Sequence, residues 1–243
     1  MAFPTTPDPR RNLGFTTVVA VPRDGNWQGQ SALVNLAGDG AAEAVVRSPV
    51  ALHAAFTTRT SGYPGSLMGV IAVLRQTLLT AQQYRDKLND PRRPYDPTSA
   101  ALLPALDGKV PVVFAADGAE SIRRALRLAD EFRLQPIIYG GTEAWRVAEL
   151  LKSRNIPVVV DLALTPPSAG TFFGGRRGGR EEPANSQARL DAESNPGRLE
   201  KAGVRFAFAS AGVERPEQIP AQLRTAISHG LGKTAALGAL TSS

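Results

Sequence analysis

The residues able to bind a metal or act as nucleophiles are few in this chain. Its 243 residues include two histidines, His53 and His229, and no cysteine. The lack of cysteine excludes disulfides, thiolate metal sites and a cysteine nucleophile. A catalytic zinc ion takes about three ligands from His, Asp or Glu and keeps one position for water. With two histidines in the whole sequence, few imidazole ligands are available for such a centre.

Two polar side chains stand at the ends of predicted strands. Tyr139 ends an apolar run at 136–139, and Asp161 ends another at 157–161. Barrel enzymes hold their chemistry at the carboxyl ends of their strands, so both residues are candidates for substrate binding. An Asp that opens a loop also serves as a turn residue. Asp117 follows the run at 110–115 and is the nearest other carboxylate.

A loop at 164–185, rich in Gly and Pro, carries the densest cluster of positive charge: Arg176, Arg177 and Arg180. These guanidinium groups, together with backbone N–H groups, could clamp an anion. A glycine-rich surface loop without a ligand is the alternative.

The two histidines each have a structural and a functional interpretation. His53 lies in an apolar run, where it is either a ligand or base on a barrel interior or a buried core histidine. His229 precedes Gly230 at a predicted helix end, where its partial charge favours the helix dipole.

Several function classes lack their motifs. There is no G-x-S-x-G, no G-x-G-x-x-G and no complete phosphate-binding loop. Gly230 to Thr234 imitates the end of such a loop but follows a predicted helix. The net charge is +6, yet no zinc-finger spacing, aromatic RNA-binding motif or basic helix accompanies it, so we expect no nucleic-acid partner.

The elements that must position these residues alternate along the chain. β-Branched and apolar runs predict strands at 14–22, 49–56, 110–115, 136–139, 157–161 and 204–209, with a small hairpin from 31–36 and 44–47. Apolar residues at three- and four-residue steps predict helices at 67–88, 117–132, 142–152, 186–202, 215–230 and 231–240. The proline-rich segment 91–98 is predicted to be a linker.

Short apolar strands between amphipathic helices are typical of a parallel sheet covered on both faces. We therefore predict an α/β fold, a partial or complete TIM-like (β/α) barrel, as a single domain over 14–243. Residues 1–13, with three prolines, are predicted to form an extended arm. No run reaches 18 apolar residues and no signal peptide is recognisable, so we expect no membrane span and a cytoplasmic location.

Several segments, taken in order, resemble the amidohydrolase superfamily in its imidazolonepropionase-like branch. The resemblance covers most of 12–241 and rests on Gly14–Thr17, Gly29–Leu36, Arg47–His53, Gly62–Gly69, Asp107–Val112, Ser121–Phe132, Gly141–Ala144, Gly203–Ser210 and His229–Thr241. It implies a (β/α) barrel of the metal-dependent hydrolase type, in which one or two metal ions activate water against C–N bonds.

The resemblance also implies where metal ligands should stand. At the positions that match the family's two later histidines and its aspartate, this chain has Ala115, Gly140 and Ala211. The family's His-x-His pair would precede Gly14. We therefore expect no metal cofactor for this chain.

Two functions remain open. The first is a non-catalytic relative that binds a small molecule or peptide, or acts as a scaffold or partner of an active paralogue. The second is a zinc-dependent or other metal-dependent amidohydrolase whose metal-binding N-terminal part lies outside this chain; such a protein could be exported. An incomplete barrel exposes strand edges, so a homo-oligomer or a paralogous partner chain is expected.

Overall fold

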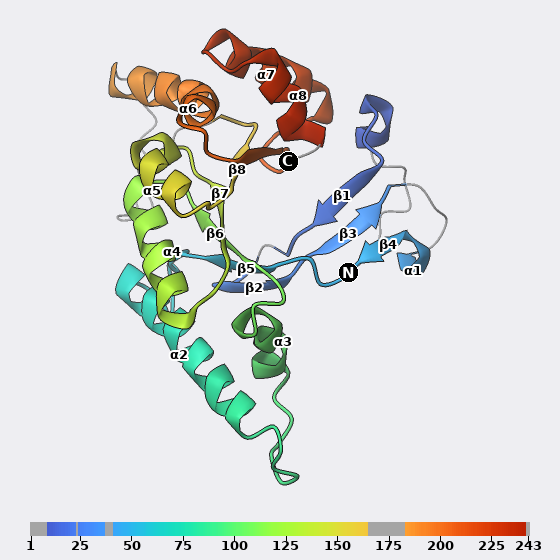
Figure 1. Cartoon of the computed structure of the whole chain (residues 1–243), viewed down its shortest axis with the longest axis vertical. Helices are drawn as coiled ribbons and strands as arrows, with labels where there is room; N and C mark the ends of the chain where they lie inside the picture. Colours follow the sequence, from blue (N-terminus) through green and yellow to red (C-terminus); the bar gives the residue numbers. More distant parts are fainter. Residues whose placement is uncertain (1–8, 23, 37–40, 165–182, 242–243) are drawn as a thin grey trace. The chain divides into compact units, whose positions relative to one another are not determined.

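A computed structural model describes residues 9–22, 24–36, 41–164 and 183–241 of the chain. The chain divides into two compact units. Unit 1 comprises residues 1–114 and 125–136, and unit 2 comprises residues 115–124 and 137–243. The division falls inside two strands and one helix, β6, β7 and α4, which Figure 1 labels and whose bounds are given below.

Unit 1 contains a small antiparallel sheet with the strand order β1-β3-β4. Each of these strands contains valine. Val34 of β3 lies opposite Val18 of β1 on one side and Val45 of β4 on the other. This arrangement confirms the hairpin predicted from 31–36 and 44–47. The elements are η1 Pro9–Leu13, β1 Thr17–Ala20, β3 Ala32–Asn35, α1 Ala41–Ala44 and β4 Val45–Arg47. The 3₁₀ helix η1 stands where an extended arm was predicted, and residues 1–8 lie outside the described ranges.

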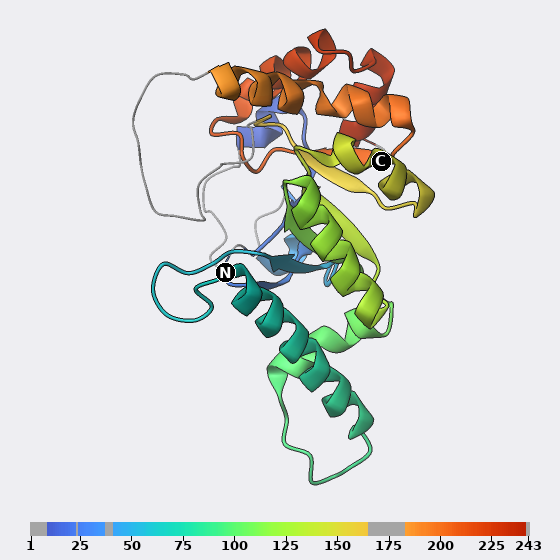
Figure 2. The same ribbon diagram turned by 90° about the vertical axis from the view of Figure 1, so that its left-hand side faces the viewer.

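The rest of unit 1 builds on three further strands and two helices. Strand β2 pairs antiparallel with β5, and β5 is followed in the strand order by β6. Phe56 and Phe114 stack at 6.3 Å between ring centroids. Helices α2 and α3 pack on each other (Figure 2). The bounds are β2 Trp27–Gln30, β5 Leu52–Ala55, α2 Leu67–Asp86, α3 Pro97–Leu106 and β6 Val112–Ala116.

Residues 91–96 form no helix or strand, as the linker predicted over 91–98 requires, and helix α3 begins at its last two residues. Asp96 caps its first turn by accepting a hydrogen bond from the N–H of Thr98, at 3.0 Å. Pro97 takes the first helical position, where the missing N–H costs nothing. Pro97 therefore begins a helix, whereas Pro91 and Pro94 precede it in the linker.

Unit 2 is built on parallel strands. The end of β6 is followed by β7, β8 and β9, and both β7–β8 and β8–β9 pair in parallel. The buried side chains of Ile138, Val158 and Val160 form an apolar layer of this sheet. The elements are α4 Ala119–Phe132, β7 Pro136–Gly140, η2 Ala144–Val147, α5 Ala148–Ser153, β8 Val158–Asp161, α6 Pro183–Ala202, β9 Phe206–Ala209, η3 Pro216–Gln218, α7 Ile219–Ser228 and α8 Lys233–Thr241.

The observed class is a mixed α/β fold with a sheet of parallel strands, as predicted. In the described residues the sheets have edge strands and do not close into a barrel, so only the partial form of the predicted barrel is seen. None of the described helices combines the length and the apolar character that crossing a membrane requires.

Candidate functional site

The carboxyl ends of the parallel strands in unit 2 bring Tyr139 and Asp161 together. The Tyr139 hydroxyl donates a hydrogen bond to Asp161 Oδ2 at 2.7 Å. The parallel register of β7 and β8 explains why these two side chains are in contact. Tyr139 lies opposite Val159, and Asp161 follows Val159 by two residues on β8. Both side chains are half-buried. Tyr139 and Asp161, which the sequence analysis proposed as separate candidates, therefore belong to one cluster.

Backbone donors fill the remaining acceptor positions of the Asp161 carboxylate. The N–H of Ala163 donates to Oδ1 at 3.0 Å, which closes an Asx turn directly after β8. The N–H of Gly212, beyond β9, donates to Oδ2 at 2.9 Å. A Cβ on Gly212 would lie 2.7 Å from Oδ1, so the absence of a side chain there permits this approach. Asp161 therefore orients its neighbours and serves as a turn residue as well.

Asp117 is a second carboxylate at the same strand ends. It follows β6 directly, and its backbone carbonyl accepts a hydrogen bond from the N–H of Glu143 at 3.0 Å. The side chain reaches the surface. Partial desolvation by the surrounding protein, and then the negative charge of Asp161, raise the pKa of this carboxyl above its ordinary value of 3.8. In the described part of the chain, no hydrogen bond or ion pair involves this carboxylate. It is thus the acceptor that the site leaves available.

Gly140 makes room for Asp117. Its φ of +89° is a backbone conformation that favours glycine. An ideal Cβ on Gly140 would overlap Asp117 Oδ1 and lie 3.1 Å from Asp117 Cγ. A larger side chain at this position would displace the carboxylate.

A buried asparagine fixes the turn after Gly140. Asn195 of α6 is fully buried, with 0% of its surface exposed. Its Nδ2 donates to the Gly141 carbonyl at 3.0 Å, and its Oδ1 accepts from the N–H of Trp145 at 3.1 Å. The helix α6 thereby holds the segment that places Gly140 beside Asp117.

An open groove of about 580 Å³ lies next to these strand ends, beside the first turn of α4. It is lined by residues 118–121, Arg123, Glu143, Trp145 and Arg146. The Glu143 carboxylate already accepts the N–H of Ala119 at 3.1 Å, so the start of α4 is capped from within the chain. Thr142 Oγ1, just before the next helical segment, has no hydrogen-bond partner in the described residues.

The donor set does not fit a catalytic metal ion. Among the described residues, no group of three His, Cys, Asp or Glu side chains lies close enough to hold one. Ala115 lies in β6, Gly140 ends β7 and Ala211 follows β9. Asp117 and Asp161 supply carboxylates alone, without the imidazole ligands that zinc prefers.

Among the other predicted site residues, His53 is described and does not join this cluster. His53 lies in β5 of unit 1, 8% exposed, and burial lowers its pKa to about 4. Its Nε2 has no hydrogen-bond partner in the described residues, so His53 is a neutral core histidine at pH 7. Arg176, Arg177 and Arg180 lie outside the described residues, and the anion clamp stays a prediction.

Sequence reasoning missed Gly212, Asn195 and the role of Gly140. The doublet Gly140–Gly141 directly after a strand was the one local signal, since both have positive φ. Asn195 carried no signal, because a polar residue inside a polar helix is indistinguishable from a surface residue.

Comparisons with known proteins add the following. No protein-family model matches the chain, and no curated protein does. The solved structure of an amidohydrolase from Thermotoga maritima superposes with a TM-score of 0.77 at 24% identity, over 94% of this chain and 59% of that one. A prolidase complexed with N-methylphosphonate-L-proline gives a TM-score of 0.44 at 18% identity, over 80% of this chain and 55% of that one.

The chain has an amidohydrolase-like fold. It spans about 59% of the length of the Thermotoga amidohydrolase. Within this fold, Asp117 follows β6 directly, Tyr139 lies near the end of β7 and Asp161 ends β8.

Proposed function

We propose that this chain is an amidohydrolase-like binding protein, of the imidazolonepropionase-like branch, that has no metal centre of its own. The observation that carries the proposal is the pairing of Gly140 with Asp117. The position matched to a family histidine holds a glycine, and the space beyond its Cα is filled by the Asp117 carboxylate. A metal ligand at 140 would require the Asp117 carboxylate to leave its observed position.

The ligand that suits the site donates hydrogen bonds. Asp161 has its acceptor positions filled by Tyr139, Ala163 and Gly212. Asp117 is left as the acceptor for a ligand N–H group, such as an amide or amine of a small molecule or peptide. We propose binding, with the chain acting alone or as the partner of an active paralogue, and no hydrolysis by this chain.

Metal content tests the proposal. Protein purified without chelator is analysed by elemental analysis, and again after zinc loading and desalting. The expected result is no stoichiometric metal in either sample. One or two tightly held ions per chain would overturn the proposal and support a hydrolase. The Asp117→Asn and Asp161→Asn variants then tell whether retained zinc sits at the strand ends.

The second candidate is a metal-dependent hydrolase of C–N bonds whose ligands lie on a segment outside this chain. The fold match to an amidohydrolase of which this chain spans 59% favours it. Reading the DNA upstream of the Met1 codon tests it. An open frame encoding His-x-His ahead of Gly14 supports this candidate, provided that the longer protein retains metal and hydrolyses an amide. A stop codon in frame just upstream counts against it.

We also propose that the chain associates with a second copy or a paralogous chain. In unit 2, β9 pairs with β8 on one side and is the last strand of its sheet order. An edge strand of this kind is a template for pairing. Sedimentation at micromolar concentration should show a dimer or larger species, and a single monomeric species would contradict the association.

A further inference from the structure

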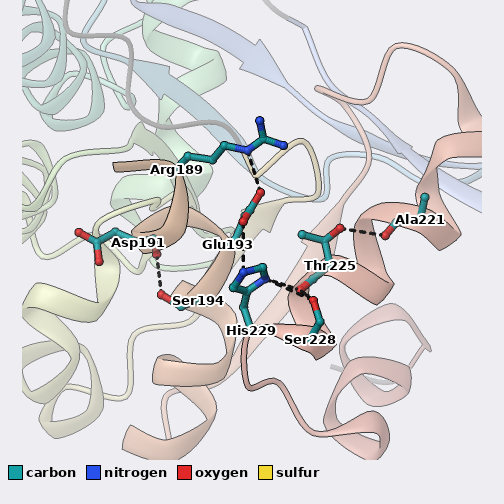
Figure 3. A network of polar contacts seen from close by, with 8 residues as sticks. All are labelled: Arg189, Asp191, Glu193, Ser194, Ala221, Thr225, Ser228 and His229. Carbon is teal, nitrogen blue, oxygen red and sulfur yellow. Dashed lines mark hydrogen bonds and ion pairs between the residues drawn. The ribbon is translucent and has the colours of Figure 1, made fainter. Parts of the chain in front are cut away.

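A second polar cluster of unit 2 joins α6 to the end of α7. Glu193 of α6 is 8% exposed, and its Oε1 accepts from Arg189 Nε at 2.9 Å. Its Oε2 lies 3.5 Å from Nε2 of His229, the C-cap residue of α7 (Figure 3). The His229 Nδ1 lies 2.9 Å from the Thr225 carbonyl and 3.3 Å from Ser228 Oγ. We call Glu193 and His229 the α6–α7 clasp.

The contacts of the His229 imidazole determine which ring nitrogen carries the hydrogen in its neutral form. The Thr225 carbonyl can only accept, so Nδ1 carries a hydrogen and donates it. In the neutral imidazole the lone pair of Nε2 therefore faces the Glu193 carboxylate, and no hydrogen bond joins them. A second proton on Nε2 turns the same contact into an ion pair with a charge-assisted hydrogen bond. The clasp is thus stronger when His229 is charged.

The clasp is connected to the strand-end site through one helix. Asn195, two residues after Glu193 on α6, bonds to Gly141 and to the N–H of Trp145. Arg198, one turn further, stacks over the Trp145 ring at 4.1 Å from its centroid. Gly141 in turn follows Gly140, the residue that leaves space for Asp117. A displacement of α6 therefore reaches both the Trp145 ring and the turn beside Asp117.

We propose that protonation of His229 regulates the strand-end site by tightening the α6–α7 clasp and so fixing the position of α6. This inference rests on the proposed binding function of that site. The charged groups on these helices are Arg189, Asp191, Glu193, Arg198, Glu200 and Lys201 on α6, Arg224 on α7 and Lys233 on α8. Asp191 pairs with Arg198 at 2.9 Å, and Glu200 accepts the N–H of Gly232 at 2.7 Å. Glu193 is the carboxylate within ion-pair distance of His229 among the described residues.

The chain offers a specific reporter. It contains two tryptophans, so the Trp27→Phe background leaves Trp145 as the only one. The pKa of His53 is lowered to about 4 by burial, so His53 does not change its charge between pH 5 and 8. Trp145 fluorescence followed across that range in the Trp27→Phe protein therefore reports on His229 with little interference. The histidine ring signals, recorded by NMR in the same samples, give the titration directly.

The expected result is a single transition in Trp145 emission that coincides with the His229 ring titration. His229→Asn abolishes the transition, since an amide cannot take the proton. Glu193→Gln weakens the transition, because the charged imidazole loses its ion-pair partner. Glu200→Gln is the matched control on the same helix and retains the transition. Asp117→Asn also retains it, which separates the clasp from titration at the strand ends.

Constant emission between pH 5 and 8 while the His229 ring titrates would overturn the inference, and so would a transition that persists in His229→Asn. A circular dichroism spectrum and a melting curve establish that each variant is folded. If His229→Asn does not fold, Glu193→Gln and the NMR titration decide the question. The emission change needs no ligand, so failure of the clasp is distinguishable from failure of the proposed function, which the metal analysis tests separately.

Discussion

The Asp117 carboxylate occupies the space that a side chain on Gly140 would need. An ideal Cβ at residue 140 would overlap Asp117 Oδ1, and Gly212 stands in the same relation to Asp161, at 2.7 Å from Oδ1. Two glycines at strand ends thus each admit one carboxylate from the neighbouring strand. The acidic character of the site depends on residues that have no side chain.

Replacing Gly140 by alanine should destabilise the protein. The new Cβ meets the Asp117 carboxylate and must also adopt a φ of +89°. We expect a loss of about 1–3 kcal/mol in the free energy of unfolding, measured by urea denaturation. Gly238→Ala is the control, because no heavy atom lies within 4 Å of its Cβ position in α8, and it should be neutral or slightly stabilising. The Asp117→Ala background should reduce the cost at 140, and an undiminished cost would show that backbone strain alone is responsible.

The Asp117→Asn variant should be more stable than the parent protein at neutral pH. The pKa of Asp117 is raised in the folded state above 3.8, so the folded protein binds the proton more tightly than the unfolded chain. Stability therefore falls as the pH rises from about 3.8 through the folded pKa, and the ionised carboxylate is the costly form. Asparagine removes this cost and keeps the shape. Denaturation curves at several pH values should show the gain shrinking toward pH 4, and a gain that grows on acidification would contradict the assignment.

The Tyr139→Phe variant should lose the hydrogen bond from the hydroxyl to Asp161 at 2.7 Å. We expect a cost of about 1 kcal/mol, since one hydrogen bond between half-buried groups contributes about that much. Tyr95→Phe is the matched control, because Tyr95 is 76% exposed. A double-mutant cycle with Asp161→Asn isolates the pair, and additive single effects would mean that the two side chains are not coupled.

The Asn195→Ala variant should be costly although it removes a single polar side chain. The substitution leaves the Gly141 carbonyl and the Trp145 N–H without the hydrogen-bond partner that the buried Asn195 side chain supplies. The expected loss is about 2–3 kcal/mol, together with a change in Trp145 emission. Gln187→Ala, at an exposed position of the same helix, should stay within about 0.5 kcal/mol. Equal effects of the two substitutions would remove Asn195 from its role in holding the turn.

Local patterns predicted most of the elements. The helix expected at 67–88 is observed as Leu67–Asp86, because its apolar residues recur at helical steps and Ser66 caps its start. The apolar runs at 136–139, 157–161 and 204–209 are β7, β8 and β9. Helix α3 was missed because its prolines were interpreted as breakers, whereas one of them occupies the first helical position.

The sequence by itself determined the strand runs, the helix periods, the scarcity of histidine and the placement of Tyr139 and Asp161 at strand ends. Only the tertiary structure decided which residues meet. Asp161 and Gly212 are 51 positions apart, and Asn195 and Gly141 are 54 apart. Such contacts depend on the parallel register of neighbouring strands and on how α6 packs, and no local pattern encodes either. The role of Gly140 also depends on tertiary structure. The sequence does not show that the Asp117 side chain occupies the space where a Cβ on Gly140 would lie.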